Sequence, residues 1–338
     1  MTGTKFAILG GGAWGLALAK LLSENGHHAG VWEYNQEFVQ LLQDTHSNPF
    51  LLKDIILPDN ITFSNNFEDI LQPDTGHIIF AIPSQFLRTS VKNAAPFICA
   101  LHELKSIINV AKGVEEHTLK RMSEVLGSEL PDTFKSKIVC LSGPSHAEEV
   151  ARQIPTAVVV AGKDDKLLMT IQELLSNPYF RVYRSEDITG LEIGGAVKNI
   201  IAIAAGIVDG LGYGDNTKGA LLTRGLVEIQ RLGVALGAQS DTFLGLSGVG
   251  DLFTTAASQH SRNRHVGYEI GLGKTLVDIL GSMKSVAEGV ATTRSVNELR
   301  KQVQVEMPIT EQVYEVLFNS KPPRQAITDL MTRSLKSE

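Results

Sequence analysis

The stretch FAILGGGAWGLALAKLL, residues 6–22, points most directly to the fold of this chain. The apolar run before the glycines has the character of a β-strand, and the residues after them form a good helix. Gly10, Gly12 and Gly15 follow the GxGxxG spacing. We expect the first to allow a tight turn, the second to let a pyrophosphate approach, and the third to let helix and strand pack closely. Free N–H groups at a helix start favour phosphate. The stretch predicts a dinucleotide-binding β-α-β unit; the alternative is a glycine-rich turn without a ligand.

The end of the second predicted strand, residues 29–34, bears on the choice of cofactor. It reads Glu33-Tyr34-Asn35. An acidic residue about 20 positions after the glycines commonly hydrogen-bonds an adenosine ribose, which favours NAD, whereas a basic residue accommodates the phosphate of NADP. Glu33 is well placed for the ribose, but a glutamate at a strand end is as often simply solvated. The preference between NAD and NADP stays open.

Composition describes an ordinary soluble protein of about two domains. The chain has 338 residues, of which 43% are hydrophobic and 20% charged. The formal net charge of −6 argues against nucleic acid or an anionic membrane as the main partner, although a small anion can bind locally. Cys99 and Cys140 lack CxxC or zinc-type spacing, so we expect two buried thiols in a reducing compartment, the cytoplasm. His260 and His265 lack metal-ligand spacing, and no metal site is predicted.

Neither a signal peptide nor a membrane span is expected. The first strand begins right after Thr4-Lys5, which leaves no room for a leader. The most apolar stretch, residues 200–208, is about half as long as a membrane span requires.

The first half of the chain alternates strand and helix patterns. Beyond the first two strands, we expect strands at 77–82, 107–111, 137–141, 156–161 and 180–183, with helices at 36–44 and 166–175. This alternation predicts a Rossmann-type α/β domain, residues 1–187, with a mainly parallel sheet and helices on both faces.

Polar residues follow several of these strands, where an open α/β sheet presents its ligand crevice. Pro83-Ser84-Gln85 ends one strand, and Lys112 follows another, where a lysine is usually solvated. After the strand at 137–141, we expect Ser145 to cap a helix whose first turn carries Glu148 and Glu149.

The texture changes at residue 187, and helical patterns replace strands. We expect an all-α substrate domain, residues 188–338. Its first helix is apolar almost all round, yet it contains Glu192, Gly195, Lys198 and Asn199 on a broad face. A buried lysine is costly unless it is paired or used, and a partly desolvated one can exchange a proton near neutral pH. The alternative is a buried Glu192–Lys198 ion pair that only fixes packing.

Two further polar clusters lie in the helical half. The glycine-rich turn at 245–252 presents Asp251 just before a helix. The segment at 258–264 places Arg262 beside Asn263, which together can hold a phosphate through charge-assisted hydrogen bonds. Each cluster taken singly is as well explained as a surface turn.

Together these motifs resemble those of bacterial-type NAD(P)-dependent glycerol-3-phosphate dehydrogenase, over essentially the whole chain. The resemblance rests on GGGAWGLALA at 10–19, NVAKG at 109–113, LSGPSHAEEV at 141–150, EIGGAVKNIIAIAAGIVDG at 192–210, GLSGVGDLFTT at 245–255, SRN at 261–263 and VAEGV at 286–290. The family's fold is a Rossmann domain followed by a helical substrate domain.

The resemblance implies roles for individual residues. Lys198 corresponds to the catalytic proton acceptor, and Lys112 to a catalytic lysine that touches cofactor and substrate. Other positions that match substrate contacts are Gly143, Ser145, Asp251, Ser261, Arg262 and Asn263. Positions that match cofactor contacts are Ala13, Trp14, Tyr34, Ala147, Arg262, Val286 and Glu288, beside Gly10, Gly12 and Gly15. Some relatives carry a basic residue near Glu33, so a strong NADP preference is not expected.

The resemblance also implies an activity: reversible hydride transfer between NAD(P)H and dihydroxyacetone phosphate, a phosphorylated triose, which gives sn-glycerol 3-phosphate for phospholipid synthesis. Relatives are usually homodimers. One alternative is another two-domain dehydrogenase acting on a hydroxy acid, which shares a helix lysine but none of the other motifs. The second is a Rossmann module that senses NAD(P)H without turnover, which needs no buried proton donor.

Overall fold

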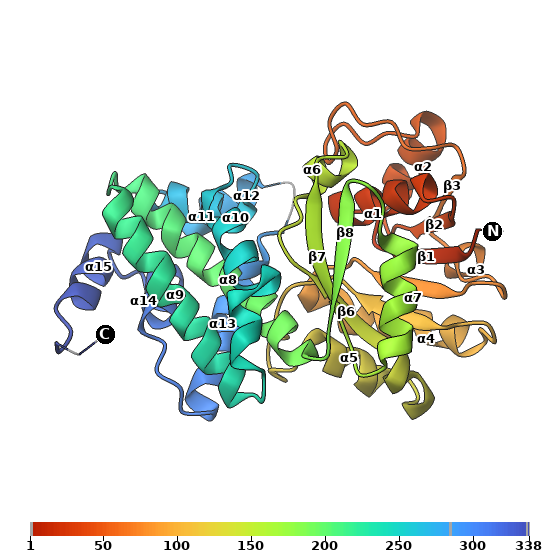
Figure 1. The fold of residues 1–338 in the computed structure, drawn as a ribbon. Helices are drawn as coiled ribbons and strands as arrows, with labels where there is room; N and C mark the ends of the chain where they lie inside the picture. The colour runs from red at the N-terminus through yellow and green to blue at the C-terminus, as the bar shows by residue number, and fades with distance from the viewer. Residues whose placement is uncertain (1–2, 284–285, 336, 338) are drawn as a thin grey trace. The chain divides into compact units, whose positions relative to one another are not determined.

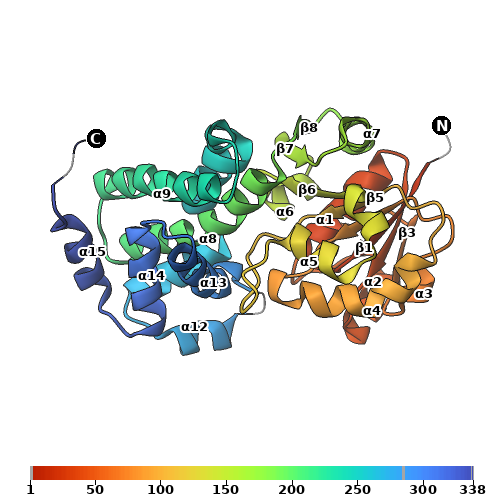
Figure 2. The same ribbon diagram turned by 90° about the horizontal axis from the view of Figure 1, so that it is seen from below.

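A computed structural model describes residues 3–283, 286–335 and 337. The chain packs as two compact units, shown in Figures 1 and 2. The first consists of Met1–Ala111 and Met122–Leu191, and the second of Lys112–Arg121 and Glu192–Glu338. The short excursion at 112–121 therefore packs with the second unit, although the first unit flanks it in sequence.

The first unit is built on an eight-stranded sheet in the order β3-β2-β1-β4-β5-β6-β7-β8. The strands are β1 Lys5–Leu9, β2 His28–Trp32, β3 Ile61–Ser64, β4 His77–Phe80, β5 Ser106–Asn109, β6 Ile138–Ser142, β7 Thr156–Ala161 and β8 Phe180–Ser185. All neighbours run parallel except β6 and β7. The predicted mainly parallel sheet is confirmed. Strand β3 was not predicted, because its segment, ITFS, alternates apolar and polar residues over only four positions and contains no apolar run like those of the predicted strands.

Helices cover both faces of this sheet, as the alternation of side chains along β1 requires. The helices are α1 Ala13–Glu24, α2 Gln36–Thr45, α3 Phe67–Ile70, α4 Leu87–Cys99, α5 Met122–Glu129, α6 Ala147–Ala151 and α7 Asp165–Leu175. Phe6 and Ile8 belong to the core with α1, α2, α6 and α7. Ala7 and Leu9 belong to the core with α3, α4 and α5.

The two cysteines differ in exposure. Cys140 on β6 is buried, as predicted, but Cys99 at the end of α4 is exposed. The buried positions of α4 are Leu87, Val91, Ala94 and Ile98. Cys99 falls outside this helical spacing, so the prediction that both thiols are buried was wrong for Cys99.

From residue 188 onward, the described residues of the second unit form helices joined by turns and loops, with no strand among them. Its helices are α8 Ile188–Gly210, α9 Asp215–Ala235, α10 Asp251–Ala257, α11 Arg262–Gly271, α12 Leu276–Ser282, α13 Glu288–Gln302, α14 Pro308–Phe318 and α15 Pro323–Met331. The predicted fold class, a Rossmann-type domain followed by an all-α domain, is confirmed.

Helix α8 forms the core of this unit. It has 23 residues, and an 18-residue window of it has a mean hydropathy of 1.7, so by length and composition alone it is able to cross a membrane. The apolar run at residues 200–208 is one part of this helix. Its apolar window is 100% buried among the other helices, as expected of a core helix in a folded domain.

Glycines bring α11 against α8 at close range. A Cβ atom on Gly206 would lie 2.0 Å from the carbonyl oxygen of Arg264, and one on Gly267 would lie 1.9 Å from that of Ile203. Only glycine permits this backbone approach. The contact sets the start of α11, with its predicted phosphate residues, beside the middle of α8.

Candidate functional site

The glycines of the loop after β1 differ in their surroundings: two are required by packing, and one faces open space that suits a ligand. Gly10 has a φ of +120°, and its Cβ would lie 2.5 Å from the carbonyl oxygen of Ala81. A Cβ on Gly15 would lie 1.9 Å from the carbonyl oxygen of Gly10. At Gly12, by contrast, a Cβ would meet nothing within 4 Å among the described residues. Packing accounts for the first and third glycines, and the space at Gly12 fits an approaching pyrophosphate.

The start of α1 suits an anion. Gly12 is its N-cap, and no described side chain caps the helix or places an acid in its first turn. The first intrahelical hydrogen bond runs from the N–H of Leu16 to the carbonyl of Gly12, 3.0 Å. The N–H groups of residues 13–15 precede that bond, as in other helix starts that bind phosphate. The loop therefore fits the dinucleotide that the sequence predicts.

Glu33 supports this loop from the end of β2. Its side chain is buried, and Oε2 accepts a hydrogen bond from the N–H of Gly11, 3.0 Å, while Oε1 accepts one from the N–H of Asn35, 3.1 Å. Burial raises the pKa of Glu33 despite these hydrogen bonds. The alternative of a solvated glutamate was wrong. A contact with the ribose stays a prediction, as does the cofactor contact of Tyr34, which is 76% exposed.

The turn after β6 differs from its prediction in one respect. The Oγ of Ser145 donates a hydrogen bond to the carbonyl of Gly143, 3.0 Å, and the N-cap of α6 is His146. Ser145 is therefore not the cap, because its hydroxyl bonds back within the turn. Glu148 and Glu149 lie in the first turn of α6 as predicted. The ligand contacts of Gly143, Ser145 and Ala147 stay predictions.

The second unit gathers four polar side chains that we call the lysine–aspartate cluster: Lys112, Lys198, Asp251 and Thr255. Asp251 Oδ1 accepts a hydrogen bond from Lys198 Nζ at 2.5 Å, and Oδ2 accepts one from Lys112 Nζ at 2.7 Å. Lys198 also donates to Thr255 Oγ1 at 2.5 Å. One carboxylate thus orients two ammonium groups that lie 86 residues apart in sequence, 198 minus 112.

The environment of the cluster perturbs its charges. Burial lowers the pKa of Lys198 to about 8, since Asp251 offsets only part of the desolvation and the nearby charge of Lys112 adds to the lowering. Burial also opposes the ionised form of Asp251, but the two lysines outweigh it and lower the pKa of that carboxyl. With both lysines protonated the cluster carries one net positive charge, which suits a developing oxyanion.

The predicted alternative of a Glu192–Lys198 ion pair is wrong. Glu192 Oε2 instead pairs with Arg121 Nη1 at 2.7 Å. Six residues along a helix of 3.6 residues per turn place two side chains about 120° apart, too far to meet. The side chain of Asn199 bonds within its own helix, where Nδ2 donates a hydrogen bond to the carbonyl of Gly195 at 3.4 Å.

The glycine-rich turn before α10 aims Asp251 at Lys198. Residues Leu246–Gly250 form one π-helical turn, a feature frequent at functional sites. A Cβ on Gly194 of α8 would lie 2.5 Å from the carbonyl oxygen of Ser247. The turn therefore lies directly on α8, and Asp251 begins α10 next to it.

The start of α11 presents Arg262. The Oγ of Ser261 accepts a hydrogen bond from the N–H of Arg264, 3.2 Å, and caps the helix. Asn263 is buried, and its Oδ1 accepts one from the N–H of Gly289, 2.9 Å. Arg262 is exposed at the first helical position. Two of these three predicted substrate contacts, Ser261 and Asn263, thus also have a structural role, and the phosphate clamp of Arg262 and Asn263 stays a prediction.

The remaining predicted positions lie at the start of α13. Val286 is 46% exposed, and Glu288 is the first residue of the helix. Their cofactor contacts stay predictions. Within the described residues, no group of three or more His, Cys, Asp and Glu side chains is placed to hold a metal ion.

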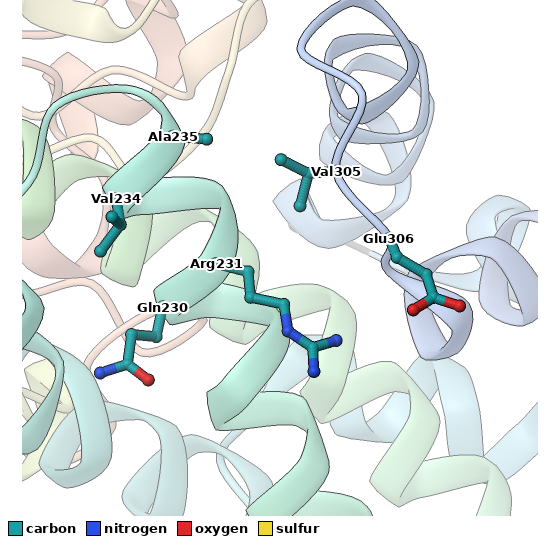
Figure 3. A pocket seen from close by; sticks show the side chains of 6 residues that line it. All are labelled: Gln230, Arg231, Val234, Ala235, Val305 and Glu306. Carbon is teal, nitrogen blue, oxygen red and sulfur yellow. The ribbon is translucent and has the colours of Figure 1, made fainter. Parts of the chain in front are cut away.

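A pocket of about 480 Å³ in the second unit contains none of the predicted site residues. Gln230, Arg231, Val234 and Ala235 of α9 line one side, and Val305 and Glu306 line the other, as Figure 3 shows. It is separate from the lysine–aspartate cluster in its residues.

Sequence reasoning missed two participants. Thr255 lies four residues after Asp251, one helical turn, so the spacing held a signal for it. Arg121 had no local signal, because its partner Glu192 lies 71 positions away.

A nucleotide-type glycine loop on a doubly wound sheet, together with a buried lysine of lowered pKa in a helical unit, defines a two-domain dehydrogenase. Comparison with known families makes this specific. The NAD-dependent glycerol-3-phosphate dehydrogenase N-terminus model matches residues 5–168, and the C-terminus model matches residues 187–328. The chain belongs to this family, which makes it an oxidoreductase with NAD(P)-dependent glycerol-3-phosphate dehydrogenase activity. The resemblance seen in the motifs is confirmed.

Individual relatives agree over nearly the full length. The chain is 47% identical over 336 residues to the glycerol-3-phosphate dehydrogenase (NAD(P)+) of Geobacter sp. (strain M21), covering 99% of this chain and 98% of the relative. It is 45% identical over 338 residues to that of Carboxydothermus hydrogenoformans, covering 100% and 99%. The glycerol-3-phosphate dehydrogenase structure from Coxiella burnetii superposes with a TM-score of 0.92 at 33% identity, covering 98% of this chain and 100% of that one. D-mandelate dehydrogenase, at 13% identity and a TM-score of 0.62, shares the fold alone.

Proposed function

We propose that this enzyme interconverts dihydroxyacetone phosphate and sn-glycerol 3-phosphate with Lys198 as the proton donor and acceptor. The observation that carries the proposal is the state of this lysine. It is buried, held by Asp251 and Thr255, and its pKa is lowered to about 8. An acid–base group is most effective when its pKa lies near the working pH.

The glycine loop and the start of α1 hold the dinucleotide in this proposal. NAD(P)H supplies the hydride when bound, and the protein contributes orientation and electrostatics. The N–H groups after Gly12 face the pyrophosphate, with Glu33 fixing the loop through Gly11. A ribose contact from Glu33 favours NAD, and the experiment below measures the preference.

The lysine–aspartate cluster handles the charge that appears on the substrate. When the ketone is reduced, its oxygen becomes negative, and the Lys198 ammonium stabilises this charge and donates the proton. Lys112 provides a second positive charge, while Asp251 keeps both ammonium groups oriented. Removal of one such donor commonly costs about 10²- to 10³-fold in kcat. In the oxidation direction, neutral Lys198 takes the proton from the hydroxyl.

The start of α11 binds the substrate phosphate in this proposal. Arg262 is exposed at its first position, and Asn263 lies beside it with its carbonyl group fixed by Gly289. A guanidinium forms strong, directed hydrogen bonds to phosphate, and a fixed phosphate places the reacting carbon. Ser261, Gly143 and Ser145 complete the predicted substrate contacts.

Membership of the family supports a proposal for the wider setting of this activity. We propose a cytoplasmic homodimer that supplies glycerol 3-phosphate for phospholipid synthesis. Residues 1–187 form the cofactor domain, apart from the excursion at 112–121 that packs with the second unit, and residues 188–338 form the substrate domain. Size-exclusion chromatography with light scattering measures the assembly, and a monomeric mass would overturn the dimer.

The test is the initial rate of NADH and, separately, NADPH oxidation by purified protein with dihydroxyacetone phosphate. Unphosphorylated dihydroxyacetone is the matched control, since it keeps the ketone and lacks the anion. We expect a fast rate that requires the phosphate. A folded protein that binds NADH but shows no rate with either cofactor would overturn the proposal.

A further inference from the structure

Lys112 reaches Asp251 from a small folded excursion, residues 112–121, which we call the Lys112 strap. Its two ends meet in an isolated antiparallel bridge between Val114 and Arg121. Inside it, the N–H of Glu115 donates to the carbonyl of Lys120 at 3.0 Å. His117 and Leu119 have φ values of 69° and 58°, which non-glycine residues rarely adopt. The strap is thus a loop whose conformation is fixed by its own hydrogen bonds.

The strap is attached to the helical unit by buried polar contacts. Arg121 Nη1 lies 2.7 Å from Glu192 Oε2, and the side chains are 17% and 2% exposed. On the other side of the bridge, Ser295 Oγ of α13 donates to the carbonyl of Val114 at 2.8 Å. Val114 itself is fully buried in the core of this unit. Both ends of the bridge are therefore held by the second unit.

The geometry relates these contacts to the reaction. Arg121 is nine positions from Lys112 in sequence, but the bridge places it opposite Val114, two residues from Lys112. Its partner Glu192 lies on α8, the helix that also carries Lys198. A lysine side chain is long and flexible, so its ammonium is well placed only if its backbone is fixed.

We propose that Arg121 and Glu192 are positioning residues. Their ion pair fixes the position of the Lys112 strap relative to α8, so that Lys112 and Lys198 both bind the carboxylate of Asp251. The inference rests on the proposed function, because it gives Arg121 its effect through Lys112. A buried ion pair adds little stability over an apolar pair of the same size. The ion pair contributes geometry instead, because a charged hydrogen bond is directional and fixes the position of the strap.

A double-mutant cycle with dihydroxyacetone phosphate tests the proposal. The variants are Arg121→Ala, Lys112→Ala and the two combined, with Arg121→Lys as the conservative change. We expect Arg121→Ala to lower kcat/KM by about 10- to 100-fold, as misplacement of a binding group does. In the Lys112→Ala background the same change should cost less than about 2-fold. Arg121→Lys should recover part of the loss.

Controls separate positioning from general damage. Arg184→Ala removes an arginine from an exposed ion pair with Asp165 and should leave the rate unchanged. Ser295→Ala, which removes the second attachment, provides an independent variant if Arg121→Ala does not fold. It should lower kcat/KM in the same direction, and again only when Lys112 is present. Circular dichroism and thermal unfolding report whether each variant is folded.

A pH profile gives a readout that loss of folded protein does not move. The charge of Lys112 contributes to the low pKa of Lys198. Displacing the strap should therefore raise the midpoint of the kcat profile in Arg121→Ala, and Lys112→Ala should raise it in the same direction. The inference would be overturned if the losses in kcat/KM from Arg121→Ala and Lys112→Ala were additive. It would also be overturned if the midpoint of the kcat profile were unchanged in folded Arg121→Ala and Ser295→Ala. If Lys112→Ala itself is fully active, both this inference and the proposed role of Lys112 fail.

Discussion

Replacing Asp251 by asparagine tests the chemistry of the cluster most directly. The side chain keeps its shape but loses the charge shared by Lys198 at 2.5 Å and Lys112 at 2.7 Å. The buried Lys198 ammonium then loses the negative charge of Asp251. The protonated form of Lys198 is disfavoured, so its pKa falls below the value of about 8 that it has in the intact cluster.

The size of this fall follows from the contact that is lost. A hydrogen bond to a charged group contributes about 1.5–3 kcal/mol. At about 1.4 kcal/mol per pKa unit, the pKa of Lys198 should drop by about 1–2 units. At pH 8 the protonated fraction then falls from about one half to about 1–10%, and reduction of dihydroxyacetone phosphate should slow about 5- to 50-fold.

The assay is kcat for ketone reduction between about pH 5.5 and 9.5, a window that spans the Lys198 pKa of about 8 and the lower pKa expected for the variant. The midpoint of the falling limb should move down by the amount given above. Thr255→Val is the matched control, because it removes the other acceptor of Lys198 without changing charge and should shift the midpoint by less than about one unit. A folded Asp251→Asn enzyme whose midpoint is unchanged or higher would refute the reasoning.

Four further outcomes are expected. Lys198→Ala should lower kcat by about 10²- to 10⁴-fold without unfolding the protein, and near-normal turnover would remove its acid–base role. Arg262→Ala should raise the KM for dihydroxyacetone phosphate about 10- to 100-fold through lost charge-assisted hydrogen bonds, and an unchanged KM would exclude it from the phosphate site. Gly206→Ala should lower the free energy of unfolding, measured in urea, by about 1–3 kcal/mol, because its Cβ would lie 2.0 Å from a carbonyl oxygen of α11. Gly219→Ala on α9, where a Cβ meets nothing within 4 Å among described atoms, should not; equal losses in both would contradict the packing argument. Burial lowers the pKa of His77 to about 4. Below about pH 6.5 this histidine is therefore protonated in the unfolded chain but stays neutral in the folded chain. The free energy of unfolding should fall by about 3 kcal/mol as the pH drops from 6.5 to 4, and a His77→Gln variant with the same slope would contradict this origin.

Much of the fold was readable because its signals are local. The glycine loop, the strand at 156–161 and the change to helices after residue 187 each depend on residues within one turn or one strand. Errors arose where a residue had several local options. Ser145 was expected to cap a helix, but its hydroxyl binds the carbonyl of Gly143 instead. Cys99 looked apolar in its segment, yet it falls off the buried face of α4.

The amino-acid sequence by itself determined that a lysine, an asparagine and a glutamate enter an apolar helix and that a glycine loop precedes α1. Only the tertiary structure decided the partners. Lys198 pairs with Asp251, 53 residues on, and Glu192 with Arg121, 71 residues back. Helical periodicity says which side of a helix a residue occupies, but not which distant segment packs there. That choice depends on close contacts such as Gly194 against Ser247, which form only when the whole unit folds.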